Sequence, residues 1–518
     1  MSSDNSGLIA AALQKTQPVI SLSMDVEDSF KEWVKQGGAR ISLYRDYERG
    51  NHRAVVTTQM RRMLRLNPDD SGLTDFNANY CQVIIDHMAG RLHVNEITLG
   101  DEAKDKDWLS PLLQFNNWDA LQGTVFRGSI RDGDSFVMID PETLKWTSEP
   151  AYDGFSGVYA LFANNANTPY WACKIWSEAS AADQEEIMRV VVYEPEKVSY
   201  WRGEDGGTEL IPDNLISLDE LSKQGVKLEV KEGTDMANTF VNYRPWIISK
   251  IPIIHFVNKY DNYSDSGESE IRPGIPLQDV LNRTLHSMVM ASEFAAFNIL
   301  WSKGIALDVA GIQPGAVLNL LLKDSTGNAV TEPTPEMTAF LNAVQVGQFT
   351  GTDIGQYTNQ IDKIVREISQ VTQTPIYGIT NQGAVSGEAL KQLEIGLIGK
   401  CERFQRQNTD AIRDLIRLSA EMQKTFQTSY EGVAPEIDQV QVAWKSPEIL
   451  DVTAQLLALV QMRRDASGLW DDDFYRAKIG ALLGMAQSDV KTESDNAKNS
   501  QSLNLLTLTG GLGGIPVA

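Results

Sequence analysis

The stretch Ser386–Phe426, SGEALKQLEIGLIGKCERFQRQNTDAIRDLIRLSAEMQKTF, decides how the rest of the chain can be arranged. It has the pattern of one helix of about 40 residues, which at 1.5 Å per residue is about 60 Å long. Ser386 suits the N-cap position, and Glu388 places a negative charge in the first turn, where the helix dipole favours it. Six acidic and seven basic side chains are mixed along the helix. Because its length exceeds the width of a small domain, we expect it to cross a larger body or to lie along a partner.

Two further helical patterns precede the long helix and enclose a small β segment. Apolar residues at helical steps predict helices over 277–303 and 352–373, while 304–332 has short β patterns around a tight turn. A short helix is expected over 338–346, and the loop 376–385 leads into the long helix. A compact β module at the end of two helices makes a poor enzyme pocket. It fits one spoke of a ring in which helices line an axial hole.

The first half of the chain has a different pattern. Helices are predicted over 29–47, 79–91 and 108–131. Short β-branched or aromatic runs, bounded by Gly, Asn or Asp, then predict strands at 135–140, 159–163, 171–176, 189–193, 198–201 and 251–257. These elements indicate an α+β domain over about 30–255 with a meandering antiparallel sheet, which the strand at 251–257 closes.

The regions outside these elements are simpler. A strand is predicted at 440–444, followed by a pair of helices over 447–464 and 471–483. Residues 1–29 form an N-terminal arm whose beginning is loose. The end of the chain, 486–518, is rich in Ser, Asn, Thr and Gly, and we expect a flexible tail.

Composition excludes several classes of protein. The 518 residues suggest three or four domains, and 46 basic against 69 acidic residues give a net charge of −23. Such an acidic chain is a poor candidate for static binding to DNA or to anionic lipid. Three widely spaced cysteines indicate neither a disulfide framework nor a zinc site. We expect no signal peptide and no membrane helix, hence a soluble protein that is not secreted by the classical route.

No motif in the sequence predicts catalysis, a cofactor or a metal. Gly396–Cys401 superficially resembles a phosphate-binding loop, but its spacing is wrong and it lies inside a predicted helix. Gly383–Gly387 misses the nucleophile-elbow spacing by one residue. The five histidines do not occur at metal-ligand spacing, and Asp471–Asp473 is more simply an acidic helix start. The sequence therefore predicts no catalytic residue, no cofactor and no metal site.

Several short motifs, in a fixed order, resemble portal proteins of tailed double-stranded-DNA bacteriophages. They are Tyr44–His52 (YRDYERGNH), Asn77–Tyr80 (NANY) with Val83–Asp86 (VIID), Ile251–Asn258 (IPIIHFVN), Thr374–Gly378 (TPIYG) and Val385–Leu390 (VSGEAL). Each is short, but together with the helix, β module and helix plan they give a resemblance over about 30–485.

The resemblance implies an α+β portal-type subunit and assigns its parts. They are an N-terminal arm (1–29), a wing (30–255, completed by the long transverse helix and return strand of 386–446), a loop and first stem helix (256–303), a β clip (304–335), a short helix and second stem helix (336–375), a tunnel loop (376–385), a helical crown (447–485) and a flexible tail (486–518).

The resemblance also implies a place in the virus and a set of partners. The subunit would form a homo-oligomeric ring, expected to be a dodecamer, at one capsid vertex, after assembly in the host cytoplasm. Its partners would be the major capsid protein and scaffold, the terminase large subunit, a head-completion adaptor and the double-stranded DNA that passes through the channel. No membrane is involved.

The candidate site residues lie in the tunnel loop and the clip. From the residues alone, 376–385 is most simply a helix–helix connector, whereas the resemblance favours a contact with DNA. The loop has no Lys or Arg, so it suits a soft contact with a sliding duplex. The candidates for this contact are Tyr377, Gly378, Asn381, Gln382, Gly383 and Val385. The candidates for partner contact at the clip, chosen for predicted exposure, are Lys323, Asp324 and Asn328.

Two other functions remain open. A packaging enzyme, such as a nuclease or an ATPase, would need a carboxylate cluster or a phosphate loop, and the sequence offers neither. Another ring-forming connector, adaptor or baseplate component is also possible, although such proteins are usually smaller and do not need the long helix.

Overall fold

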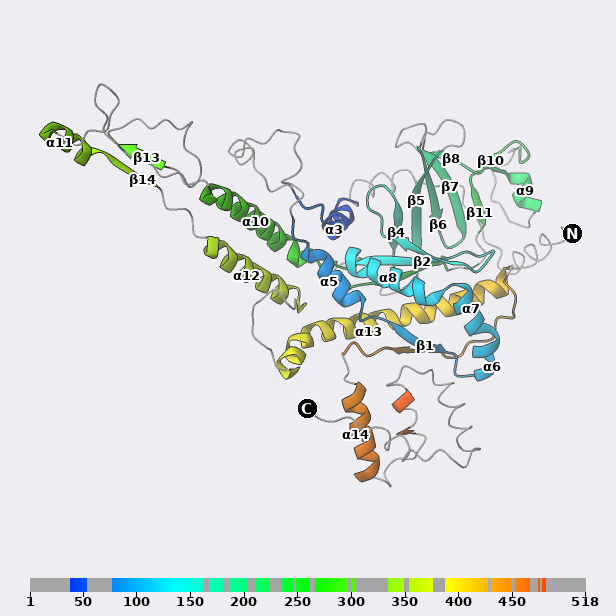
Figure 1. Cartoon of the computed structure of the whole chain (residues 1–518). Helices are drawn as coiled ribbons and strands as arrows, with labels where there is room; N and C mark the ends of the chain where they lie inside the picture. The colour runs from blue at the N-terminus through cyan, green and yellow to red at the C-terminus, as the bar shows by residue number, and fades with distance from the viewer. Residues whose placement is uncertain are drawn as a thin grey trace. The chain divides into compact units, whose positions relative to one another are not determined.

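The computed structural model describes residues 38–53, 77–162, 167–179, 186–203, 210–223, 235–245, 248, 250–260, 266–296, 300–303, 334–348, 354–375, 387–426, 428, 430–448, 452–465, 474–475 and 478–480. The chain divides into two compact units (Figure 1): unit 1 comprises residues 1–45, 84–272 and 388–518, and unit 2 comprises 46–83 and 273–387. The N-terminal arm, the flexible tail and the strands expected within 304–332 lie outside the described residues.

Unit 1 contains the predicted antiparallel meander. Its consecutive strands are β4 (Gly157–Leu161), β5 (Trp171–Ala179), β6 (Glu186–Tyr193) and β7 (Lys197–Gly203), and β7 is followed at the edge by β8 (Leu210–Pro212) and β11 (Tyr243–Pro245). Alternate side chains of β5 and β6 build the core on one face, where Cys173, Ile175, Val190 and Val192 are buried. The prediction of a meandering sheet is confirmed.

The strand expected to close this meander belongs to a second sheet. The strand β12 (Ile253–Val257) pairs with β2 (Asp134–Ile139), which also pairs with β3 (Trp146–Pro150). In the described part, only an isolated bridge between Ala151, next to β3, and Val158 of β4 connects these three strands to the meander. Every residue of β12 is buried, as is typical of a strand covered on both faces. The sequence prediction of a single sheet was therefore wrong. The strand β3, with its few β-branched residues, was not predicted.

The helix predicted over 108–131 is divided in two. The π-helical turn Asp105–Leu109 leads into α7 (Ser110–Phe115), and α8 (Trp118–Asp132) follows after a break at Asn116 and Asn117. The buried Asn116 amide donates to the carbonyl of Leu144 at 3.2 Å and accepts the backbone N–H of Trp146 at 2.7 Å. Its partners lie far along the chain, so a local pattern did not reveal the break.

The long helix is present as predicted. α13 (Gly387–Thr425) has 39 residues and lies along the other elements of unit 1 (Figure 1). Its buried stripe includes Leu397, Phe404, Ile412 and Leu415. The hydroxyl of Ser419, also on α13, accepts the indole N–H of Trp146 at 3.0 Å. The return strand β15 (Gln441–Trp444) pairs with β1 (Val94–Thr98).

Unit 2 contains the helix pair. α10 (Ile275–Ala296) and α12 (Ile354–Val371) pack together, and β13 (Leu300–Lys303) pairs with β14 (Gln345–Gln348). The helix predicted to run to 303 therefore ends at Ala296, because 300–303 hydrogen-bonds to a strand instead. The short helix α11 occupies Pro335–Ala343, earlier than the predicted 338–346.

The remaining elements are short or lie at the ends of the described chain. They are α3 (Ala39–Arg49), α5 (Tyr80–Ala89), α6 (Glu102–Lys104), β9 (Ile216–Ser217), α9 (Leu218–Lys223), β10 (Phe240–Val241), the 3-10 turn Arg272–Gly274 and α14 (Val452–Asp465). No helix among the described residues is long and apolar enough to cross a bilayer.

Candidate functional site

The candidate contact residues lie outside the described residues. This holds for Tyr377, Gly378, Asn381, Gln382, Gly383 and Val385 of the tunnel loop and for Lys323, Asp324 and Asn328 of the clip. What the structure describes is the set of elements to which these segments are attached. One helix end and two polar clusters hold those elements in place, and a third polar cluster orders a turn elsewhere in unit 1.

The helix that leads into 376–385 ends at a fixed point. At the C-terminus of α12 the N–H of Thr374 donates to the carbonyl of Ser369 at 3.0 Å, and the N–H of Gln373 donates to that of Gln370 at 3.2 Å. Gln373 has a left-handed φ of 50°, so the turn is a Schellman motif with glutamine in place of the usual glycine. Thr374 is fully buried. The loop therefore starts from an ordered helix end.

The first helix of the pair is held in unit 2 by two side-chain amides one turn apart. Gln278 donates to the carbonyl of Ala78 at 2.5 Å and accepts the backbone N–H of Tyr80 at 3.0 Å. Asn282 accepts the N–H of Ala78 at 3.1 Å and lies 2.8 Å from Nδ1 of His52. We call these five residues the amide cluster. It brings together two of the sequence motifs, Tyr44–His52 and Asn77–Tyr80, as structural supports.

The amide cluster also determines the protonation state of His52. The Ala78 N–H fixes Oδ1 of Asn282, so Nδ2 of Asn282 must donate to Nδ1 of His52. Nδ1 is therefore an acceptor, and the imidazole is neutral with its proton on Nε2. Burial lowers the pKa of His52, which favours the same neutral form.

A buried ion pair holds the long helix in unit 1. Lys400 of α13 donates to Oε2 of Glu270 at 2.9 Å, with only 3% and 1% of the two side chains exposed. Lys259 lies 3.2 Å from the same oxygen, and the amide of Asn258 donates to the other oxygen at 3.2 Å. We call these four residues the ionic cluster. Burial alone would raise the pKa of Glu270, but the two ammonium groups outweigh it and hold that pKa below its usual value.

Beside the ionic cluster, Asp134 and two glycines lie in close contact. The carboxylate of Asp134 accepts the N–H of Gly267 at 2.7 Å and lies 2.8 Å from Nε2 of His255. Gly133 has a φ of 95°, and a Cβ built on Gly267 would lie 2.3 Å from the carbonyl oxygen of Gly133. Asn258 and His255 come from the motif Ile251–Asn258, so this motif too is structural.

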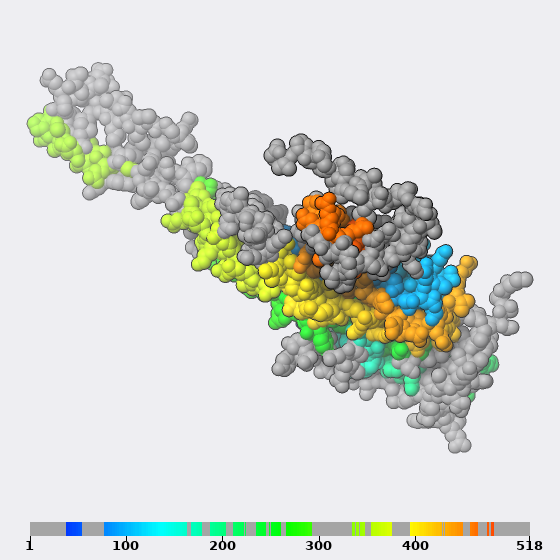
Figure 2. Space-filling view, turned by 90° about the horizontal axis from the view of Figure 1, so that it is seen from below, coloured from blue at the N-terminus to red at the C-terminus, as the bar shows by residue number. Residues whose placement is uncertain are grey.

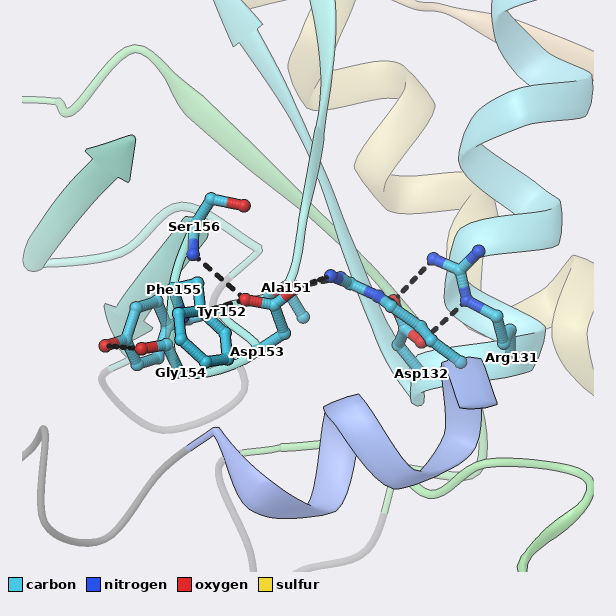
Figure 3. Close-up of polar contacts among 9 residues, drawn as sticks. Arg131, Asp132, Ala151, Tyr152, Asp153, Gly154, Phe155 and Ser156 are labelled. Atoms are coloured by element: carbon cyan, nitrogen blue, oxygen red, sulfur yellow. Dashed lines mark hydrogen bonds and ion pairs between the residues drawn. The ribbon is translucent and has the colours of Figure 1, made fainter. Parts of the chain in front are cut away.

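A third cluster is centred on Arg45 of α3. Its guanidinium donates to Asp132 at 3.0 Å, to the carbonyl of Ala151 at 2.7 Å and to Asp153. Figure 3 shows Arg131 donating to the same Asp132, and Asp153 accepting from the backbone of the turn Asp153–Ser156. The cluster therefore fixes a tight surface turn in unit 1.

None of the three clusters provides a catalytic arrangement. No group of three or more His, Cys, Asp or Glu that could hold a metal ion occurs in the described ranges. The cysteines at positions 81, 173 and 401 are buried, and burial raises the pKa of each thiol. The clusters order helices and turns, which is the chemistry of a scaffold. Sequence reasoning missed Glu270, Gln278, Asn282 and Lys400, because nothing in their local pattern distinguishes them from solvated polar residues.

The chain is similar to known phage proteins along most of its length. The family model described as phage portal protein, SPP1 Gp6-like, matches residues 41–466. The portal protein of Mycobacterium phage D29 is 21% identical over 447 residues, which cover 83% of this chain and 81% of the relative. The portal protein of Mycobacterium phage L5 is 20% identical over 487 residues, which cover 92% of this chain and 88% of the relative.

Solved structures from gene transfer agent (GTA) particles are also similar. The neck of the empty GTA particle, computed with C6 symmetry, has a TM-score of 0.35 and 12% identity, and covers 83% of this chain and 93% of that chain. The neck of the native GTA particle, computed with C12 symmetry, has a TM-score of 0.37 and 11% identity, with 84% and 94% covered. Because the family model spans residues 41–466, this chain belongs to the SPP1 Gp6-like family of phage portal proteins.

Proposed function

We propose that twelve copies of this chain form a ring at a single vertex of a tailed-phage capsid, and that genomic DNA enters and leaves through it. The observation that carries the proposal is the family match over residues 41–466. Closed cyclic symmetry is the usual way in which identical subunits assemble. The helix pair α10–α12 supports a channel, since it forms an extended element rather than a pocket.

The charge of the chain suits a channel in which DNA must slide. DNA carries one phosphate charge per about 1.7 Å of helix axis, and binding strength rises with each phosphate that a protein neutralises. A chain with a net charge of −23 has no excess of cations to hold the duplex. Within the ring, residues 376–385 contact DNA through uncharged groups: Tyr377, Gly378, Asn381, Gln382, Gly383 and Val385.

Other surfaces of the ring meet proteins. The clip, with Lys323, Asp324 and Asn328, binds the terminase large subunit during packaging and the head-completion adaptor afterwards. The major capsid protein and scaffold surround the ring while it assembles in the host cytoplasm. The ring itself catalyses no reaction, because the terminase supplies the ATP-driven work.

The mass of the purified protein tests the ring. Twelve copies of 57.4 kDa give about 690 kDa, which native mass spectrometry or sedimentation measures directly. A negative-stain image should show a central hole. A protein that stays monomeric under every assembly condition would contradict the proposal, and ATP hydrolysis by the pure protein would favour a packaging enzyme instead.

A deletion tests the role of the tunnel loop. Shortening 378–384 should leave the ring assembled but reduce the DNA packaged per capsid, because the DNA contact is lost. The matched control shortens the connection between β7 and β8, residues 204–209, which joins two strands of unit 1. Normal DNA filling in the loop variant would contradict the assignment of 376–385.

A further inference from the structure

Three side-chain hydroxyls close the last turn of α12. The hydroxyl of Ser369 donates to the carbonyl of Thr374 at 2.7 Å, and the hydroxyl of Thr374 donates to the carbonyl of Thr372 at 3.1 Å. The hydroxyl of Thr372 donates to the carbonyl of Ile368 at 2.7 Å. We call Ser369, Thr372 and Thr374 the hydroxyl cluster. Both threonines are buried, whereas another side of α12 is exposed (Figure 2, yellow-green).

The hydroxyl cluster changes the usual form of the Schellman motif. In the common form, an apolar contact joins the two positions that Ser369 and Thr374 occupy here. These two residues instead exchange two hydrogen bonds, since the N–H of Thr374 also donates to the carbonyl of Ser369 at 3.0 Å. A helix normally leaves its last carbonyls without partners. In α12 the carbonyls of Ile368, Ser369 and Gln370 all accept backbone N–H groups, so the helix end is closed.

Pro375 prevents the helix from continuing past this end. A proline has no N–H to donate to the carbonyl of Val371, and its ring disfavours a helical conformation of the preceding Thr374. Gln373 already has a left-handed φ of 50°. Lengthening α12 would therefore break the hydrogen bonds of the hydroxyl cluster, and fraying would break the same bonds. The motif Thr374–Gly378 thus begins with a helix stop.

We propose that the hydroxyl cluster positions the tunnel loop, by keeping α12 at one length so that residues 376–385 start at one height along the DNA channel. The inference rests on the proposed function. Each residue that a helix gains or loses moves its end by about 1.5 Å along the axis and turns it by about 100°. A change of one residue would move Tyr377 and Asn381 away from their proposed contact with DNA. The three hydroxyls are engaged on α12 itself, so they are positioning groups and not DNA contacts.

Hydrogen exchange in the full-length protein tests whether the cluster holds the helix end. Thr374→Val keeps the shape of the side chain without its hydroxyl and should speed exchange in peptides covering 369–374 at least about fivefold, because a hydrogen bond in a buried turn is lost. Thr374→Ser keeps the hydroxyl and should stay within about twofold of the wild type. Peptides from α10 should exchange as in the wild type, because the effect is local.

A threonine in the first turn of the same helix provides the matched control. Thr358 is exposed, and its hydroxyl lies 3.4 Å from the carbonyl of Ile354. Thr358→Val is therefore the same substitution at a site far from the helix end, and exchange at 369–374 should change less than about twofold.

DNA packaging tests whether a fixed helix end matters for the loop. Thr374→Val should reduce the DNA packaged per capsid while the rings stay near about 690 kDa, and Thr374→Ser should restore normal filling. Ser369→Ala decides the question if Thr374→Val does not assemble. Ser369 is only half-buried, and its loss removes one of the two bonds with Thr374, so packaging should fall in the same way.

Three results would overturn the inference. Exchange at 369–374 equal to the wild type in Thr374→Val and Ser369→Ala means that the hydroxyls do not hold the helix end. Normal packaging despite faster exchange means that this end does not position the loop. Faster exchange at 369–374 in DNA-filled particles than in empty rings means that the end is not fixed. Wild-type rings that package no DNA would instead overturn the proposed function, while the exchange results would still show whether the cluster holds α12.

Discussion

In unit 2 the helix α10 is held by uncharged side-chain amides, whereas in unit 1 the helix α13 is held by a buried ion pair. The amide cluster uses Gln278 and Asn282, each with donor and acceptor both engaged on neighbouring backbone or imidazole. The ionic cluster uses Lys400 and Glu270, which are almost fully buried. Each cluster holds one helix in place, but the first does so through hydrogen bonds of uncharged groups and the second through buried charges.

The difference lies in what happens when one partner is lost. A buried amide that loses its partner leaves a neutral group unsatisfied, which costs about 1–3 kcal/mol. A buried charge that loses its partner costs about 3–5 kcal/mol, because the charge stays in a poorly polarisable environment. The ionic cluster therefore orders unit 1 strongly, although the intact pair itself contributes little net stability.

Removing Glu270 should have the largest effect. Glu270→Ala leaves Lys400 buried without its carboxylate and should destabilise unit 1 by about 3–5 kcal/mol. Urea unfolding, followed by hydrogen exchange in peptides from α13 and β12, measures the loss.

An exposed ion pair in the same segment provides the control. Glu268 lies 3.2 Å from Arg272, with 41% and 59% of the side chains exposed, so Glu268→Ala should cost less than about 1 kcal/mol. The double variant Glu270→Leu with Lys400→Met should recover most of the stability, because it removes both buried charges. A Glu270→Ala protein as stable as the control would contradict the ionic role.

Helix α13 shows how much of the fold could be predicted from the sequence. Its limits, Gly387 and Thr425, lie within one residue of those predicted, because capping residues and periodicity are local signals. The residues that hold α13 in place could not be predicted from such local signals. Glu270 and Lys400 are separated by 130 residues, and no local pattern connects them. The patterns of the four consecutive meander strands, predicted at 159–163, 171–176, 189–193 and 198–201, were similarly local, whereas the pairing of β12 with β2 was not.

Removing Asn282 should have an intermediate effect. Asn282→Ala leaves the N–H of Ala78 and Nδ1 of His52 without their partner and should destabilise unit 2 by about 1–3 kcal/mol. Faster hydrogen exchange in peptides covering α10 and residues 77–80 measures this loss. Arg283→Ala, an exposed change at the next position, should stay within about 0.5 kcal/mol. If both variants exchange alike, the amide cluster does not hold α10.

The candidate site was less predictable than the fold. Gln278 and Asn282 resemble ordinary polar residues of an amphipathic helix, and their partner Ala78 lies 200 and 204 residues away in the sequence. The motifs Tyr44–His52 and Asn77–Tyr80 were noticed only through a family resemblance, which gave no physical role. The structure supplies that role by placing both motifs against α10.

The smallest expected effect concerns pH. The amide cluster is uncharged, yet its stability should depend on pH. His52 has a pKa below its usual 6.5 in the folded protein, because burial disfavours the charged imidazole. Its contribution to the stability of unit 2 is therefore complete above pH 6.5 and is lost as the pH falls through the lower, folded value. Glu270 also has a lowered pKa, relative to a usual 4.5, so the ionic cluster loses stability only in more acidic solution.

Hydrogen exchange between pH 7 and pH 4 should therefore show α10 losing protection before α13, after correction for the intrinsic pH dependence of exchange. His52→Gln should remove the early loss, since a glutamine amide accepts the hydrogen bond of Asn282 without titrating in this range. If α13 loses protection first, or if His52→Gln leaves the order unchanged, the neutral imidazole does not support the amide cluster. The two clusters would then differ only in their charge. The expected pH dependence of the amide cluster rests on the neutral tautomer of His52, which the contacts of Asn282 with Ala78 and with His52 require.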